Sequence, residues 1–324
     1  MDKISHARRS FLIALAGFGA LGENQAQLNN SQMKIIVPFP AGGTADALPR
    51  ILAEELRADF TGGVIIENRS GAGGNIGAGV VYHAIPDGTV LMASPPGPIA
   101  INQSLYRKLD FDPNLWEPVT IMASVPNVID VSPKVPMRSV QELVAYAKAN
   151  PGKLSYASQG NGSTSHLTAE LFMSLTGIEM LHIPYKGTAP ALVDIMGGQV
   201  DVFFDNLASS LTYHNAKKLS ILAVADDKRS FALPEIPTFK EAGVDGMEAI
   251  TWFAIVAPPK TPKPIIENYH KLFLRALSNS SVIQRFREQG ADPRGDTPGQ
   301  TKEFIAKEVV KWGKIIRSAH VILQ

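Results

Sequence analysis

Residues 34–56 read KIIVPFPAGGTADALPRILAEEL, and this stretch holds an apolar run, a glycine turn and a helical pattern in direct succession. The β-branched run at 34–39 predicts a buried strand. Because proline fits only the first turn of a helix, Pro49 predicts a helix that starts near Asp46. A strand, a loop and a helix in this order predict an α/β fold. The apolar residues that recur at helical spacing are Leu48, Ile51, Leu52 and Leu56.

The same alternation continues along the rest of the chain. A capping box at 139–142 and apolar patterns ended by glycine at 166–175 and 188–196 predict helices, and the pattern beyond Pro264 is purely helical. This order is typical of the α/β class, in which mixed, mostly parallel sheets are flanked by helices. Further strands are predicted at 64–66, 89–93, 154–157, 200–204, 219–225 and 249–257.

The amino-acid composition excludes several classes of protein function. A length of 324 residues corresponds to about two domains, and 45% hydrophobic residues exclude a mainly disordered chain. The formal net charge of +1 creates no field that would attract nucleic acid, so no nucleic-acid partner is expected. The chain has no cysteine, which excludes disulfides, thiolate nucleophiles and cysteine-ligated metal sites.

The first 26 residues have the layout of a secretory signal peptide. Lys3, Arg8 and Arg9 form a basic start, and an apolar run at 11–21 follows that is too short to span a bilayer. The paired arginines leave the general and the twin-arginine export routes open. Cleavage is expected between Gly22 and Gln27, either after Gly22 or after Ala26, and an ordinary buried N-terminal helix is the alternative. The predicted location is therefore outside the cytoplasm.

Two glycine-rich loops each join a predicted strand to a predicted helix. Glycines let the backbone approach a ligand closely, and a helix start supplies free N–H groups with a positive dipole end. Such loops can therefore hold an anion without a basic side chain. The alternative for the first loop is a tight turn with Thr44 or Asp46 as helix cap. The candidate ligand contacts are Phe39, Ala41, Gly42, Gly43, Thr44 and Asp46 in the first loop, and Ser158, Gly160, Asn161, Ser163, Thr164 and His166 in the second.

Other chemical sites find weak support. The glycine loop at 71–77 has Ile76 where a dinucleotide fingerprint requires glycine, and the seven histidines show no metal-binding spacing, so neither cofactor nor metal is expected. Lys186 is interpreted as an exposed loop lysine rather than a Schiff-base lysine. Ser163, His166 and Asp205 allow a secreted hydrolase as an alternative, although the chain has no G-x-S-x-G nucleophile elbow.

An ordered set of motifs resembles the Bug-type periplasmic receptors of tripartite tricarboxylate transporters. The resemblance runs from about Lys34 to the C-terminus, with departures at Pro49 and at 60–63. The motifs are IVPFPAGGTAD (36–46), ENRSGAGGNIG (67–77), PDG (86–88), NPGKL (150–154), YAS with GNGS (156–163), HIPYKG (182–187), GGQVD (197–201), FDN (204–206), AP (257–258) and TPKP (261–264).

The resemblance implies a two-lobed periplasmic binding protein of type II without catalytic residues. One lobe would comprise 27–127 plus 249–324, and the other 128–248. A di- or tricarboxylate, an acidic amino acid or an aromatic acid would bind between the lobes. The receptor, a monomer, would deliver it to two membrane-embedded transporter subunits; a role as carboxylate sensor is the alternative. Asp205 is expected to face the same cleft, as a structural acceptor, a water anchor or a cap for the helix at 207–211.

Overall fold

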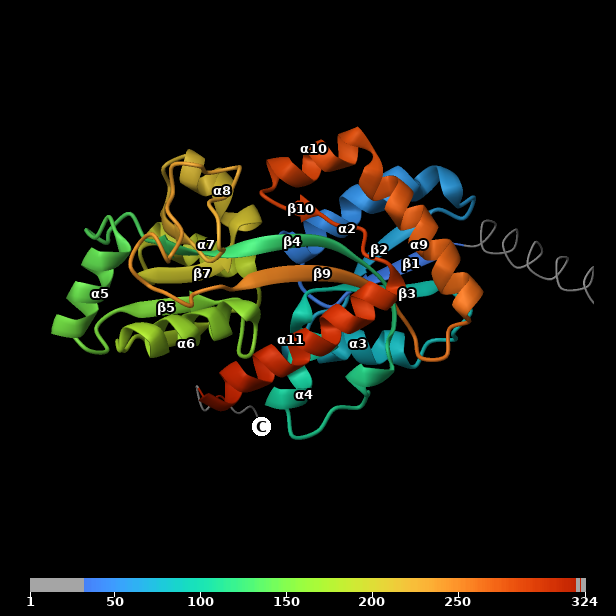
Figure 1. The fold of residues 1–324 in the computed structure, drawn as a ribbon, viewed down its shortest axis with the longest axis horizontal. Helices are drawn as coiled ribbons and strands as arrows, with labels where there is room; N and C mark the ends of the chain where they lie inside the picture. The colour runs from blue at the N-terminus through green and yellow to red at the C-terminus, as the bar shows by residue number, and fades with distance from the viewer. Residues whose placement is uncertain (1–31, 319–320, 322–324) are drawn as a thin grey trace, which may run out of the picture.

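The computed structural model describes residues 32–318 and 321, so the predicted signal peptide lies outside the described residues. Two strands, β4 (Glu117–Val131) and β9 (Ile250–Ala257), run antiparallel through the middle of the molecule and join its two halves (Figure 1). The first part of β4 pairs with β9, while the part from Asn127 onward pairs with β7 (Val202–Asn206) and β8 (Ser220–Val224).

The described strands follow the order β2-β1-β3-β9-β4-β7-β5-β6, with β8 and β10 also paired to β4. Parallel pairings join β1 to its two neighbours and β5 to its two neighbours, whereas every pairing of β4 is antiparallel. The mixed α/β architecture predicted from the sequence is confirmed. The remaining strands are β1 (Met33–Val37), β2 (Val64–Asn68), β3 (Val90–Ser94), β5 (Ser155–Ser158), β6 (Leu181–Pro184) and β10 (Asp292–Pro293).

Helices cover both faces of the strands (Figure 1). The α-helices are α2 (Thr44–Glu55), α3 (Asn75–Tyr82), α4 (Asn102–Leu105), α5 (Val140–Ala149), α6 (Thr164–Thr176), α7 (Thr188–Gly197), α8 (Leu207–Asn215), α9 (Lys263–Ser278), α10 (Ser280–Glu288) and α11 (Pro298–Ser318). Short helical turns lie at Leu56–Asp59, Ala72–Gly74, Gly97–Ile101 and Pro113–Leu115.

The helix after the first glycine loop begins earlier than the sequence predicts. Helix α2 starts at Thr44, two residues before Asp46, and Pro49 lies inside it. Proline within a helix removes one backbone hydrogen bond, but burial of Leu48, Ile51 and Leu52 against the strands keeps the segment helical. The prediction that Pro49 belongs to the first turn was therefore wrong.

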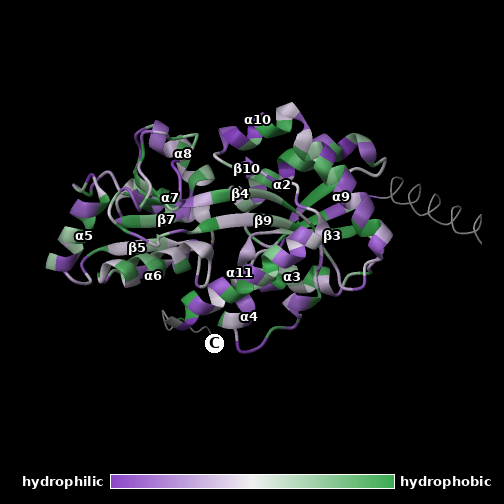
Figure 2. Ribbon diagram, in the orientation of Figure 1, coloured by the Kyte–Doolittle hydropathy of each residue, from purple (hydrophilic) through white to green (hydrophobic). Residues whose placement is uncertain are grey.

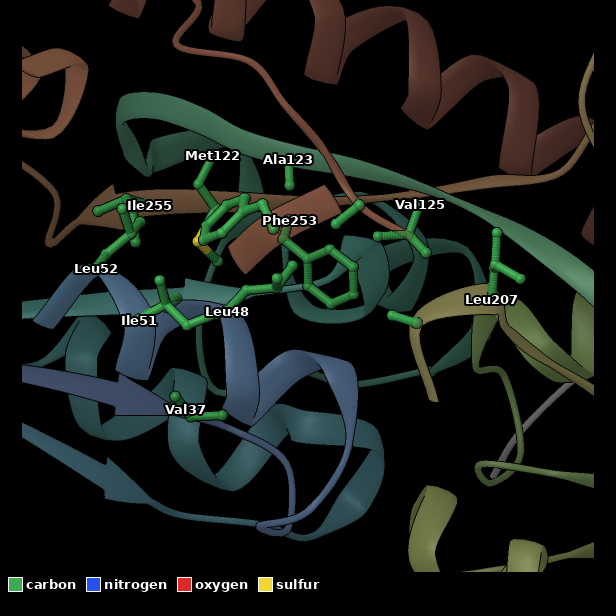
Figure 3. Close-up of a cluster of buried hydrophobic side chains, with 14 of the residues drawn as sticks. Val37, Leu48, Ile51, Leu52, Met122, Ala123, Val125, Leu207, Phe253 and Ile255 are labelled. Carbon is green, nitrogen blue, oxygen red and sulfur yellow. The ribbon is translucent and has the colours of Figure 1, made fainter. Parts of the chain in front are cut away.

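One apolar core is continuous between the two halves. It contains Leu48 of α2, Val125 of β4 and Phe253 of β9 together with Leu207 of α8 (Figure 3). Figure 2 shows the outer helices with alternating polar and apolar stretches, as expected for helices that bury one face. The chain passes between the two strand groups at 126–127 and at 249–250, where the N–H of Asn127 donates to Ala249 O at 2.9 Å. Two lobes with limits at these positions remain our proposal.

Candidate functional site

A cavity of about 550 Å³ lies where the loops that follow β1, β2 and β3 face the loops that follow β5 and β6. We name its two sides the β1 wall and the β5 wall. The β1 wall consists of Pro38, Phe39, Pro40, Ser70, Gly71, Ala72, Gly73, Gly74, Pro95, Gly97 and Tyr106. The β5 wall consists of Gln159, Gly160, Asn161, Gly162, Ser163, Thr164, Pro184, Tyr185, Lys186 and Gly187.

The β1 wall depends on a close approach between Phe39 and two glycines. A Cβ on Gly74 would lie 3.3 Å from the Phe39 ring and 2.7 Å from Pro98 Cγ, and a Cβ on Gly97 would lie 3.7 Å from the same ring. Gly74 also has φ +91°, which favours glycine. The glycine loop at 71–77 thus shapes the cavity, because its glycines leave room for the Phe39 ring to pack against the backbone.

We expect Gly74→Ala to lower the free energy of unfolding by about 2–4 kcal/mol, since the new Cβ adds overlap with Pro98 to the cost of positive φ. Gly63→Ala is the matched control, because Gly63 has φ +78° with no atom within 4 Å of the added Cβ, and should lose only about 1–2 kcal/mol. Urea unfolding measures both. Equal losses in the two variants would contradict the packing argument.

The β5 wall is built on the start of helix α6. Ser163 caps this helix: its Oγ accepts from His166 N at 3.2 Å and donates to Gly160 O at 2.7 Å. The first turn of α6 contains no acidic residue, so the positive end of the helix dipole is not neutralised locally. The N–H groups of Thr164 and Ser165 open the helix and have no intrahelical acceptor.

A buried polar network links this wall to the two central strands. Thr251 of β9 donates to Thr164 Oγ1 at 2.9 Å, and its hydroxyl is also bonded to Asn206 and Asn127, which is bonded in turn to Thr168. Thr164 therefore lines the cavity and is also hydrogen-bonded, through Thr251 and Asn127, to β9 and β4, the two strands that join the halves. A ligand that contacts Thr164 would act directly on this junction.

Two stacked histidines support the β5 wall from behind. The rings of His166 and His182 lie 4.1 Å apart at an interplanar angle of 6°, and Tyr156 stacks on His182 at 4.7 Å. His166 Nδ1 accepts from Gly162 N at 3.1 Å, and Ser158 Oγ lies 2.7 Å from His182 Nε2. Burial, helped by His166, lowers the pKa of His182 to about 4, so this ring is neutral at pH 7.

The structure separates the sequence-predicted site residues into two groups. Phe39, Gly160, Asn161, Ser163 and Thr164 line the cavity. Outside its lining lie Ala41, Gly42, Gly43, Thr44, Asp46, Ser158, His166 and Asp205. The cavity also includes the glycine loop at 71–74, Tyr106 and Lys186. None of them was predicted as a ligand contact: the loop was interpreted only as a rejected dinucleotide site and Lys186 as an exposed loop lysine, although the motif HIPYKG was a signal for the latter.

In the first glycine loop a backbone N–H group is hydrogen-bonded to a side chain of the same segment. Asp46 accepts from Gly42 N at 3.2 Å, from Arg50 and from Asn68. Burial alone would raise the pKa of Asp46, but these hydrogen bonds outweigh it and lower the pKa. A Cβ on Gly43 would lie 3.2 Å from Thr188 Oγ1 of the other half. Phe39 of this loop lines the cavity, whereas the part at 41–46 contacts the other half and lies outside the lining.

Asp205 is a buried acceptor and neither a cap nor part of the lining. Its side chain is fully buried and accepts from Gln159 Nε2 at 2.6 Å and from Ser210 Oγ at 3.3 Å. The N-cap of α8 is Asn206, so the cap interpretation was wrong. Burial raises the pKa of Asp205 to about 7, although hydrogen bonds partly oppose this rise. Asp205 thus positions Gln159, which does line the cavity.

The hydrolase alternative is not supported by the side-chain geometry. The two ring nitrogens of His166 face Gly162 N and Glu170, while the Ser163 hydroxyl donates to a backbone carbonyl. Asp205 contacts Gln159 rather than a histidine. The described residues contain no cluster of three or more His, Asp or Glu side chains suited to a metal ion. Among the helices in 32–318, none is long and apolar enough to cross a membrane.

Comparison with known proteins places this fold and cavity among transporter receptors. Residues 48–321 match the model of the family described as "Tripartite tricarboxylate transporter family receptor". The chain is 37% identical over 289 residues to Protein BugT of Bordetella pertussis, with 88% of each chain covered. It superposes on R. palustris Rpa4515, solved with adipate, with a TM-score of 0.87 at 37% identity, covering 90% of this chain and 97% of that one. The periplasmic binding protein BugD gives a TM-score of 0.86 at 33% identity, covering 91% and 99%.

Proposed function

Because the chain belongs to the tripartite tricarboxylate transporter receptor family, a family of solute receptors and not of enzymes, we propose that its cavity captures a small carboxylate for a membrane transporter. The observation that carries the proposal is the cavity of about 550 Å³ between the two halves, which combines the glycine loops at 71–74 and 159–163 with the open start of helix α6. The adipate bound by Rpa4515 supports a carboxylate ligand.

We propose a cellular setting that is consistent with this family membership. Residues 1–26 would direct export and be removed, leaving a monomeric receptor in the periplasm, where BugD is also placed. The ligand would contact Phe39 on one side and Gly160, Asn161, Ser163 and Thr164 on the other. The two lobes would close on it and present it to two membrane-embedded transporter subunits.

Thermal shift with a carboxylate panel tests this function. Malate, adipate, citrate, glutamate and benzoate are added to the mature protein, with 1,6-hexanediol as a control that keeps a six-carbon chain but has no carboxylate. A carboxylate at 100 times its Kd is expected to stabilise the fold by about 2.7 kcal/mol. The diol should give no shift, and the bound acid should be recovered chemically unchanged. If no carboxylate raises the melting temperature at millimolar concentration, the proposal fails.

A further inference from the structure

The two walls of the cavity differ sharply in polarity. On the β1 wall the side chains are three prolines next to strand ends, Phe39, Ala72 and Tyr106, with glycines between them, and Ser70 is the one small polar side chain in that set. Proline has no N–H to donate. A ligand segment that faces this wall therefore finds rings and methylene groups, and few partners for hydroxyl groups.

On the β5 wall the polar groups are many, but most of them are already engaged. The Gln159 amide donates to Asp205, the Ser163 hydroxyl donates to Gly160 O, and the Thr164 hydroxyl accepts from Thr251. Asn161 and Lys186 line the cavity without a hydrogen bond or ion pair to another residue within 32–318. These two side chains are free to meet a ligand.

Lys186 is placed beside the glycine loop by backbone pairing. Tyr185 N donates to Ser158 O at 3.0 Å, and Gly187 N donates to Gln159 O at 3.2 Å. Lys186 therefore lies next to the turn that carries Asn161, and no carboxylate side chain lines the cavity. The fixed positive charge in this cavity is thus gathered at the β5 wall, where the start of α6 adds its dipole.

We propose that the cavity selects a carboxylate with an unsubstituted apolar body: one carboxylate group lies at Lys186 and Asn161 on the β5 wall, and the carbon chain packs against Phe39 and Tyr106 on the β1 wall. This inference rests on the proposed function and narrows its ligand class. On the β1 wall only Ser70 and Tyr106 offer side-chain hydroxyls as partners, so most hydroxyl groups on the ligand chain would lose water there without replacement. One such unpaired group can cost up to about a hundredfold in affinity.

A matched pair of six-carbon acids tests the inference by calorimetry on the mature protein. Adipate and galactarate have the same chain length and the same two carboxylates, but galactarate carries four hydroxyl groups. We expect adipate to bind at least tenfold more tightly. Galactarate binding as tightly as adipate, or binding of malate with no binding of adipate, would overturn the inference while leaving the carboxylate receptor intact. If no carboxylate binds at all, the proposed function itself fails.

The place of the carboxylate is tested by Lys186→Met, which keeps the length of the side chain and removes its charge. We expect adipate affinity to fall at least tenfold in this variant. Lys153→Met is the control, since Lys153 is also exposed in the same half but lies outside the cavity lining. An unchanged adipate affinity in Lys186→Met, with the control also unchanged, would place the carboxylate elsewhere and refute this part of the inference.

Discussion

Replacing Glu308 by leucine is expected to destabilise the protein by about 2–6 kcal/mol. Glu308 lies on helix α11, and its Oε2 accepts from two buried indole groups, Trp252 Nε1 and Trp312 Nε1, each at 2.8 Å. Both indoles are 1% exposed, so water cannot replace the lost acceptor. Each buried N–H left without a partner costs about 1–3 kcal/mol, and two such groups give the stated range.

Glu308→Gln is the matched control for this prediction. The amide oxygen can accept from the same two donors with almost the same side-chain shape, so a loss of about 1 kcal/mol or less is expected. Urea unfolding followed by tryptophan fluorescence reports on both variants. A leucine variant as stable as the glutamine variant would mean that the indoles find other acceptors. The bond from Trp252 of β9 to α11 would then contribute little to holding the C-terminal helix on the sheet.

The sequence predicted the alternation of strands and helices because short buried strands and glycine-ended helices leave clear local patterns. It missed the length of β4, which runs through 117–131 with Pro118 and Pro126 inside it. Proline normally indicates a strand end or an edge, and here Pro126 lies where β4 changes from β9 to β7 as its partner. Pro126 pairs with Ile250 of β9, more than 100 positions away in the sequence. A local sequence pattern cannot reveal such a partner.

The candidate site was predicted in part for a similar reason. Glycines and hydroxyls at 158–164 have a local signature, and the loop indeed lines the cavity. The first loop has the same signature, yet Asp46 occupies its Gly42 N–H. Arg50 and Asn68 hold that carboxylate in place, and Asn68 comes from another strand, so this arrangement leaves no local signature. Tyr106 and the turn at 71–74 join the site through packing alone.

A second large effect is expected where two carboxyl groups are buried together behind the cavity. Asp130 of β4 is fully buried, bonds to Ser210, and has one oxygen, Oδ1, without a partner among the described residues. Burial, reinforced by the charge of Asp205, raises the pKa of Asp130 well above its usual value. Burial likewise raises the pKa of Asp205 to about 7. The folded state therefore holds the Asp130 proton more tightly than the unfolded chain does.

The sign of the pH dependence follows from that retained proton. Below about pH 4 both the folded and the unfolded protein carry this proton, so Asp130 does not change the free energy of unfolding. Above that pH the unfolded chain releases the proton. The folded protein then loses about 1.4 kcal/mol of stability per pH unit until the pH reaches the pKa of Asp130 in the folded state. Asp205 behaves in the same way, and its loss of stability ends near pH 7. The pair therefore makes the wild-type protein progressively less stable between about pH 4 and pH 7.

Asp130→Asn should remove the part of this loss that comes from Asp130. Asparagine has the shape of the protonated acid and cannot ionise, so it preserves the bond to Ser210 without the cost of holding a proton. We expect the variant to match the wild type near pH 4 and to become more stable than the wild type as the pH rises toward 7. Urea unfolding of both proteins at pH 4.5, 6 and 7.5 measures the difference, in which titrating groups distant from Asp130 cancel. A stability difference that does not change with pH would show that Asp130 is ionised in the folded protein, and that Gln159 is held against a doubly charged pair.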